Sequence, residues 1–369
     1  MFVYSAFYDN RPPVGKLPSL RLLTVSTFPA NALIYCYVWY AGVEIPYITK
    51  VSIVASGHGH TVGGVFYGQW LYSCSLPANS PIPTHVSLSA NKCQNSDILV
   101  PVYNPKVLSS NSHEFGVCVE VMYGEIDFAA VSEWIELNLM FGVSELHIYN
   151  GTMSTNMNKI FNVYRERGVL NLHQIPPPVP EYSITGTYLG SPASLNDCML
   201  RYAYRYKYIV VIDTDEIIVP RKQLNYSSML KQIDEAMNLT KSSISYSFRN
   251  LYHFRDLEPD MKQPTYLRSM RYLKHAKPSP FLYGAKSFID PRYCLSVFNH
   301  YCLVQFPGSP GTIDVPLDIA CSHHYRKCGF SQEECTALMN ESYHDDYMLN
   351  FKNKFNQKVL DTLQQIDYF

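Results

Sequence analysis

The stretch from Tyr208 to Pro220 constrains the fold of this chain more than any other. It reads Y-I-V-V-I-D-T-D-E-I-I-V-P, so an apolar, β-favouring run leads directly into three carboxylates. A continuous apolar run predicts a strand buried on both faces, typical of a central strand in an α/β sheet. In open α/β sheets, ligands bind beyond the carboxyl ends of the strands, which is where Asp213, Asp215 and Glu216 fall.

The acidic turn itself predicts a metal site. Three carboxylates within four residues repel one another and are costly near a core unless a cation is present. Hard divalent cations such as Mg²⁺ and Mn²⁺ take oxygen ligands and bridge carboxylates to phosphates. Asp213-Thr-Asp215 therefore indicates a site for a metal-bound nucleotide diphosphate. The alternative is a strand that ends in a solvated acidic turn, because Asp-x-Asp also arises by chance.

The composition indicates a globular chain of two domains. The chain has 369 residues, of which 47% are hydrophobic and 17% charged. A net charge of −1 gives no electrostatic basis for nucleic-acid binding. The ten cysteines include no Cys-x-x-Cys pair, which argues against a zinc ribbon, and their even number fits several disulfides.

Four glycosylation sequons, at Asn150, Asn225, Asn238 and Asn340, join the cysteines in favouring a secretory-pathway lumen. No signal peptide is visible at Met1, and the sequence has no run of about 20 apolar residues. We therefore expect a membrane anchor outside this sequence.

Two regions are expected along the chain. Residues 1–112 are expected to form a small all-β domain, with strands at 32–40, 47–55 and 65–72. Residues 113–369 alternate between strand and helix patterns, which predicts an α/β domain with a mostly parallel sheet flanked by helices. Its expected strands lie at 116–123, 145–149, 169–175, 208–219, 243–254, 286–289 and 295–300. Its expected helices lie at 127–141, 154–167, 194–206, 224–237 and 332–358, with an extended proline-rich loop at 176–180.

Five ordered blocks in the second region resemble glycosyltransferase family 92, once catalogued as a domain of unknown function. The run E-W-I-E-L-N-L-M-F-G-V-S-E-L-H-I-Y, from Glu133 to Tyr149, is similar to the family's E-W-I-E…G-V…Y segment. The later blocks are Asn196-Asp-Cys198, Asp213-Thr-Asp-Glu216, Lys286-Ser-Phe-Ile-Asp-Pro291 and His323-His-Tyr-Arg326. The resemblance covers about residues 113 to 330. It departs at Ser191-Pro-Ala-Ser194, where relatives often carry a glutamine.

The resemblance implies a GT-A-type fold, which is a nucleotide-sugar-binding α/β domain, and an inverting β-1,4-galactosyltransferase. Such an enzyme uses UDP-galactose with a divalent metal, usually Mn²⁺, with Mg²⁺ as the other choice. The expected acceptor is a glycan on a glycoprotein, with a terminal galactose or another sugar of an N-glycan receiving the galactose. The expected location is the Golgi lumen, as the ectodomain of a type II membrane protein. The N-terminal domain could bind glycans or serve as a dimerisation surface, and the sequence does not separate the two.

For the metal, the resemblance and the acidic pattern together indicate Asp213, Asp215 and His324. Asp215 is the expected main ligand, and Asp213 could instead hold the ribose or a metal-bound water. A metal at this position would act as a Lewis acid and stabilise the charge on the UDP leaving group. His324 would supply the ligand from late in the chain, with His300 in reserve; the alternative for either is a satisfied core or surface histidine.

Four further residues are candidates for contacts with the donor. Lys286 could pair with the diphosphate as a point charge, or be a solvated surface lysine. Asn196 and Asp197 could reach sugar hydroxyls from the helix before the acidic strand, or be ordinary polar helix surface. Tyr149 could border the uracil, although packing is the more frequent fate of such a tyrosine.

An inverting transfer needs a general base for the acceptor hydroxyl, commonly a carboxylate. Asp256, Glu258 and Asp290 are the candidates, and the sequence does not separate them. Acceptor specificity is expected in the loops at 176–190 and 255–277.

Two alternatives to this function remain open. One is a transferase that uses a different UDP-sugar or a retaining mechanism, which donor profiling would distinguish. The other is a carbohydrate-binding protein with an inactive transferase domain, in which Mn²⁺ and UDP would not raise the melting temperature.

Overall fold

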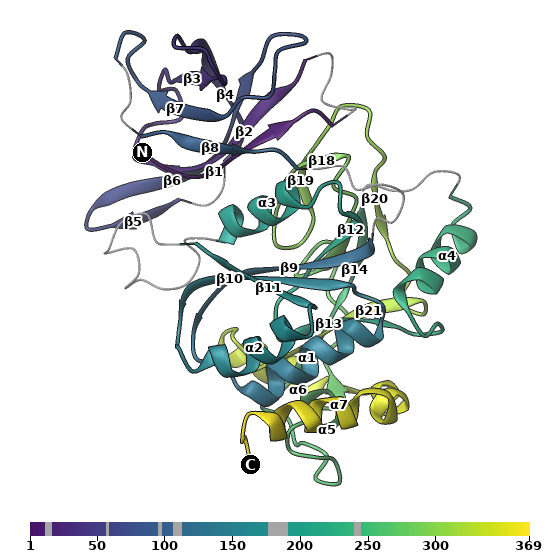
Figure 1. Ribbon diagram of the computed structural model, residues 1–369. Helices are drawn as coiled ribbons and strands as arrows, with labels where there is room; N and C mark the ends of the chain where they lie inside the picture. The colour runs from purple at the N-terminus through teal and green to yellow at the C-terminus, as the bar shows by residue number, and fades with distance from the viewer. Residues whose placement is uncertain (12–16, 57–58, 95–97, 106–112, 176–190, 240–244) are drawn as a thin grey trace.

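The computed structural model describes residues 1–11, 17–56, 59–94, 98–105, 113–175, 191–239 and 245–369. These residues form a β-barrel followed by a larger α/β region (Figure 1). The expected boundary at residue 112 and the expected loop at 176–180 lie outside the described residues. Of the described part, no helix is long and apolar enough to cross a membrane.

The barrel is built by the first 105 residues, which makes it compatible with the expected all-β region. Its strands pair in the order β2-β1-β8-β7-β3-β4-β6-β5, and β2 also pairs with β6, which closes the sheet on itself. Closure removes the edges that an open sheet would expose. The strands are β1 (Phe2–Asp9), β2 (Ser19–Ser26), β3 (Tyr35–Trp39), β4 (Tyr47–Ser56), β5 (His60–Val62), β6 (Val65–Ser75), β7 (His85–Ser89) and β8 (Val100–Tyr103).

The α/β region is organised around a seven-stranded sheet with the order β11-β10-β9-β12-β17-β14-β20. All neighbouring strands run parallel except β17, which is antiparallel to both β12 and β14. The strands are β9 (His113–Gly124), β10 (Glu145–Met153), β11 (Leu170–Gln174), β12 (Tyr206–Val211), β14 (Ser245–Phe248), β17 (Lys286–Ile289) and β20 (Thr312–Asp314). The expectation of a mostly parallel sheet is therefore confirmed.

Helices cover both faces of this sheet. Val117 and Val119 of β9 face the core made with α1, α2 and α7, whereas Cys118 and Val121 face α3 and the barrel. Figure 1 shows α3 between the barrel and the sheet, with α1, α2 and α7 on the opposite side. The helices are α1 (Phe128–Met140), α2 (Met157–Glu166), α3 (Ser191–Arg201), α4 (Tyr226–Ala236), α5 (Arg268–Arg271), α6 (Gln332–Asn340) and α7 (Lys352–Gln365), with a 3₁₀ helix at Tyr347–Phe351.

The prediction of one acid-tipped strand at 208–219 is wrong. The chain leaves the main sheet after β12, turns through residues 212–215, and enters a second, three-stranded sheet as β13 (Glu216–Pro220). The turn closes on itself, because Glu216 N donates to Asp213 O at 3.1 Å and Asp213 N donates to a Glu216 carboxylate oxygen, also at 3.1 Å. The second sheet has the order β13-β21-β15, where β15 is Asn250–Phe254 and β21 is Ala320–Arg326.

Two other expected elements are also divided. The strand predicted at 243–254 breaks at Arg249, because β14 pairs with β17 in the main sheet while β15 pairs with β21 in the second. The helix predicted at 332–358 ends at Asn340, because the following β22 (Tyr343–His344) pairs with β16 (Lys274–His275). Tertiary pairing overrides the local helical pattern there. A hairpin of β18 (Cys294–Val297) and β19 (Cys302–Gln305) completes the elements.

Eight of the ten cysteines form disulfides, as their even number led us to expect. The pairs are Cys36–Cys74, Cys118–Cys198, Cys294–Cys302 and Cys328–Cys335, while Cys93 and Cys321 are free. The second pair ties β9 to α3, and the third ties the two strands of the β18–β19 hairpin together.

The barrel is fastened to the α/β region by a shared core and by a buried arginine. Phe7 and Leu23 from the barrel pack in one cluster with Leu195 and Met199 of α3. The Arg11 guanidinium donates to the backbone carbonyl of Cys294 at 2.6 Å and also to that of Pro291. These contacts place the β18–β19 hairpin against the barrel wall.

Candidate functional site

The acidic turn lies where the order of the main sheet reverses. From β9 the chain adds β10 and β11 on one side, and then returns to place β12 on the other side. The crevice beyond the carboxyl ends of such a strand pair is the usual ligand site of an open α/β sheet. Residues 212–215 follow directly from the carboxyl end of β12, so they lie at this end of the strand pair.

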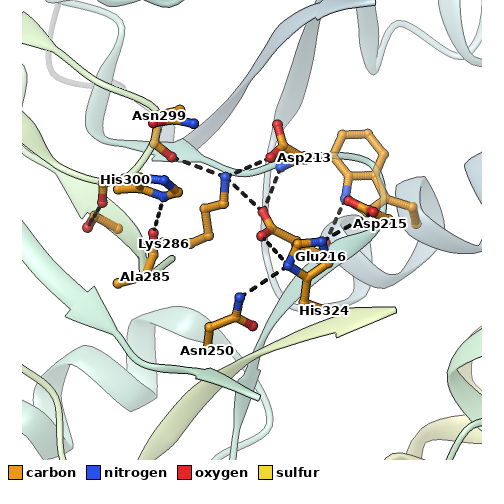
Figure 2. A network of polar contacts seen from close by, with 11 residues as sticks. Asp213, Asp215, Glu216, Asn250, Ala285, Lys286, Asn299, His300 and His324 are labelled. Atoms are coloured by element: carbon orange, nitrogen blue, oxygen red, sulfur yellow. Dashed lines mark hydrogen bonds and ion pairs between the residues drawn. The ribbon is translucent and has the colours of Figure 1, made fainter. Parts of the chain in front are cut away.

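A buried lysine holds two of the three acids. Lys286 opens β17, and its Nζ lies 2.7 Å from Asp213 Oδ2 and 2.9 Å from Glu216 Oε2 (Figure 2). The same ammonium donates to the carbonyl of Asn299 at 3.1 Å. Although burial alone would lower the pKa of Lys286, the charges of Asp213 and Glu216 raise it above its ordinary value, so the cation persists at neutral pH.

His324 joins the third acid to the same network. Its Nε2 lies 3.3 Å from Asp215 Oδ2, and its Nδ1 lies 3.0 Å from Glu216 Oε1 and 3.1 Å from the Asn250 amide (Figure 2). The sheet register places this histidine, because Glu216 of β13 is the strand partner of His324 on β21. Burial alone would lower the pKa of His324, but the nearby Glu216 and Asp215 carboxylates raise it to about 9.

The acids differ in their surroundings. Burial raises the pKa of Asp213, and the neighbouring charges of Glu216, Glu120 and Asp215 add to that rise while Lys286 opposes it. Burial alone would also raise the pKa of Glu216, but the charges of Lys286 and His324 hold it well below its ordinary value. Glu216 therefore stays ionised beneath the other two acids.

Only the two aspartates of this cluster reach solvent to a large extent. Their side chains are 35% (Asp213) and 37% (Asp215) exposed, whereas those of Glu216 and Lys286 are 2% and 1% exposed. The site therefore consists of a buried ion pair, Lys286 with Glu216, and two partly exposed carboxylates, Asp213 and Asp215. This donor set of carboxylate oxygens with one imidazole suits a hard or borderline divalent cation.

The expected metal set is only partly assembled. Asp215 and His324 lie beside one another, but Asp213 points to Lys286. Across the described ranges, the group of three possible ligands whose atoms all lie within 4.8 Å is a different one, formed by His253, His323 and Asp345. The reserve candidate, His300, is 2.8 Å from the carbonyl of Ala285 through its Nδ1 (Figure 2).

The candidates for donor contacts are engaged with other protein groups. Tyr149 is buried and donates to Asp197 at 2.6 Å, and Asp197 forms an ion pair with Arg201 at 2.9 Å. The Asn196 side chain binds both the N–H and the carbonyl of Val297, each at 2.9 Å. Lys286 forms ion pairs with Asp213 and Glu216 instead of being free to bind a diphosphate. Contacts of all four residues with the donor stay predictions.

The three candidate bases occupy different environments. Asp290 is fully buried and ion-paired with Arg292. Asp256 is exposed and accepts a hydrogen bond from the N–H of Cys328 at 2.7 Å, and Glu258 is exposed as well. Asp256 and Glu258 are therefore open to an acceptor, whereas Asp290 is closed off.

Glu133 and Trp134, from the E-W-I-E segment, stabilise the acidic turn through hydrogen bonds, which the sequence did not reveal. The Trp134 indole donates to the Glu216 carbonyl at 2.9 Å. The buried carboxylate of Glu133 accepts the N–H groups of Arg268 and Ser269 at 2.8 and 2.9 Å, and Arg268 in turn donates to the Thr214 carbonyl at 2.9 Å. Glu216 itself was visible as the third acid of the run, but Asn250 carried no signal.

The sequence model of glycosyltransferase family 92 matches residues 113–367. The chain belongs to glycosyltransferase family 92. The matched range contains the acidic turn, Lys286 and His324, so the network of Figure 2 lies wholly within the family region.

Three relatives illustrate the similarity. Beta-1,4-galactosyltransferase galt-1 of Caenorhabditis elegans is 24% identical over 229 residues, which are 59% of this chain and 51% of that protein. Glycosyltransferase family 92 protein F13G3.3 of the same organism is 22% identical, covering 68% of this chain and 49% of its own length. Galactan beta-1,4-galactosyltransferase GALS3 of Arabidopsis thaliana is 25% identical, covering 39% and 28%. The chain thus spans about half the length of these relatives or less.

Among solved structures, a mycobacterial protein is similar with a TM-score of 0.30 and 12% identity, covering 61% of this chain and 71% of its own.

Proposed function

We propose that this chain is a metal-dependent, inverting transferase that moves galactose from UDP-galactose to a glycan acceptor with a β-1,4 linkage. Family membership supports the transfer of a sugar, and the names of two relatives favour galactose and the β-1,4 linkage. The observation that carries the proposal is the pair of partly exposed carboxylates, Asp213 and Asp215, at the switch point of the sheet, with His324 beside Asp215. The strand order and this site also favour a GT-A-type fold.

In this proposal Asp215 and His324 would hold a divalent cation, Mn²⁺ or Mg²⁺. His324, which the nearby carboxylates keep protonated without the ion, would lose the proton of its Nε2 on binding it. The cation supplies Lewis-acid stabilisation of the charge that develops on UDP. Asp213 either joins the ligands or holds the donor ribose. The buried ion pair between Lys286 and Glu216 stabilises the turn that carries both aspartates.

The acceptor hydroxyl must lose a proton during an inverting transfer. Asp256 and Glu258 are the favoured bases of the three candidates, because both are exposed while Asp290 is buried against Arg292. The four disulfides support the proposal that the protein acts in an oxidising lumen, such as the Golgi.

The test is turnover of UDP-galactose with Mn²⁺ or with a chelator, using acceptors that end in galactose, GlcNAc or fucose. We expect metal-dependent transfer to one acceptor class and its loss in Asp215→Ala. Asp318→Ala is the matched control, because Asp318 is an exposed acid that precedes β21 and pairs with Lys222 rather than with the acidic turn. If wild type neither transfers galactose nor binds UDP, the proposal fails and a carbohydrate-binding protein with an inactive transferase domain becomes the better account.

A further inference from the structure

A cavity of about 390 Å³ lies between the barrel and the family 92 region. Its barrel wall comes from β2, β4 and β6 and includes Trp70, and its other wall comes from α3 and the β18–β19 hairpin and includes Phe298 and Tyr301. The volume falls within the range of small-molecule sites in proteins. The cavity is separate from the acidic network, whose residues do not appear among those described as lining it.

The lining has the chemistry of a site for a neutral sugar. Among the described residues that line the cavity, none carries a formal charge; they are apolar, aromatic, hydroxyl or amide side chains. A diphosphate would find no cation there, whereas a sugar ring can lay its apolar face on an aromatic ring and direct hydroxyls to polar groups.

One turn connects this cavity to the acidic site. Phe298 and Tyr301, which line the cavity, are joined by a hydrogen bond from the N–H of Phe298 to the Tyr301 carbonyl at 2.9 Å. The two residues between them face the other way: the carbonyl of Asn299 accepts from Lys286 at 3.1 Å, and that of His300 accepts from Ser287. The cavity wall and the floor of the acidic site therefore share residues 298–301.

The turn is also held firmly in place. Asn196 of α3 binds the backbone of Val297 at both its N–H and its carbonyl, and the Cys294–Cys302 disulfide closes the hairpin. A ligand in the cavity would therefore meet a preorganised wall at a fixed position relative to Lys286 and the acids.

We propose that this cavity binds a neutral sugar unit of the acceptor glycan, so that the barrel supplies part of the acceptor site. The inference rests on the proposed function, since the charged part of the donor would occupy the acidic site and leave the uncharged cavity to the other substrate. It assigns Trp70, Phe298 and Tyr301 as the residues that select the acceptor.

The first experiment measures direct binding, which needs no turnover. Galactose and N-acetyllactosamine are titrated into the wild-type protein, Trp70→Phe and Trp39→Phe, and intrinsic tryptophan fluorescence is recorded. We expect a saturable change in wild type and in Trp39→Phe, because Trp39 lies on β3 and is not among the lining residues. The change should disappear in Trp70→Phe. No saturable binding of either sugar, or an unaltered signal in Trp70→Phe, would overturn the inference.

The second experiment separates acceptor from donor. Trp70→Ala should raise KM for the acceptor about tenfold while KM for UDP-galactose changes less than about twofold, since one aromatic contact contributes on the order of 1 kcal/mol or more. Ala55→Phe, which fills the cavity from β4, should have the same effect without removing the tryptophan.

Equal acceptor KM values in wild type and both variants would contradict the inference while leaving the transferase intact. Absence of any UDP-galactose turnover in wild type would instead contradict the proposed function. The fluorescence titration would then test by itself whether the cavity binds a sugar.

Discussion

Two clusters of charged side chains in this protein can be compared directly, and they differ in whether all of their charged groups are buried. At the end of β1, Asp9 lies between Arg11 and Arg21, with both ion pairs at 2.8 Å. The remaining guanidinium N–H groups reach Ser73 and the carbonyls of Pro291 and Cys294. All three charged side chains are buried, so this cluster is closed.

The acidic cluster of the family region is open. It has three carboxylates against the cations of Lys286 and His324, and two of those carboxylates reach solvent. A closed cluster fastens two parts of a fold together, whereas a cluster with an excess of one charge at its surface has capacity for a ligand of the opposite charge. We infer that the first is structural and the second is the active centre.

The largest expected effect on stability comes from removing the cation beneath the open cluster. Lys286→Met leaves Asp213 and Glu216 without their partner, and breaking a buried ion pair on one side typically costs about 3–5 kcal/mol. Urea unfolding should show this loss. Lys222→Met, which breaks the exposed pair with Asp318, should cost less than about 1 kcal/mol. Equal effects of the two variants would mean that Lys286 does not hold the turn.

A somewhat smaller effect is expected from the closed cluster. Asp9→Asn leaves Arg11 and Arg21 against one neutral amide, at a cost of about 3 kcal/mol in the free energy of unfolding. Because this cluster is structural, the folded variant should transfer galactose at the wild-type rate when both substrates saturate. A large loss of turnover by the folded variant would contradict the division between a structural and a functional cluster.

The pH dependence of that cost is the smallest of these effects. Burial alone would raise the pKa of Asp9, but the charges of Arg11 and Arg21 lower it to about 2, from 3.8. A lowered folded pKa means that the stabilisation is complete above the unfolded pKa and is lost as the pH falls through the folded one. The difference in unfolding free energy between wild type and Asp9→Asn should therefore shrink by about 2 kcal/mol from pH 5 to pH 2. A difference that stays constant over this range would show that Asp9 is not ionised against the arginines.

The sequence revealed the parts of the site better than their connections. The apolar run before Asp213 predicted the buried strand β12, and the expected strand at 286–289 coincides with β17. The sequence could not show that the chain moves from the main sheet to the second sheet after Val211, because an apolar run predicts a strand but not the strand it pairs with. The contact of Lys286 with the acids was hidden for the same reason, since the sheet register sets it across more than 70 residues of chain.

The barrel shows the same limit. Strands β3, β4 and β6 confirm the predictions at 32–40, 47–55 and 65–72, with shifted ends, but β1 and β2 were not predicted. Asp9 ends β1 and Arg21 lies within β2, and a charged residue argues against a buried strand unless its partner is known. Asp9 and Arg21 form an ion pair with each other, which becomes visible only when the pairing of β1 with β2 is known.

The most direct test of the division between the clusters is calorimetric titration of UDP with and without Mn²⁺. The proteins to compare are wild type, Asp215→Ala and Asp9→Asn. We predict that wild type and Asp9→Asn bind UDP only with Mn²⁺, and that Asp215→Ala binds at least tenfold more weakly. Metal-independent binding by wild type, or full affinity in Asp215→Ala, would contradict the assignment of the open cluster as the metal and donor site.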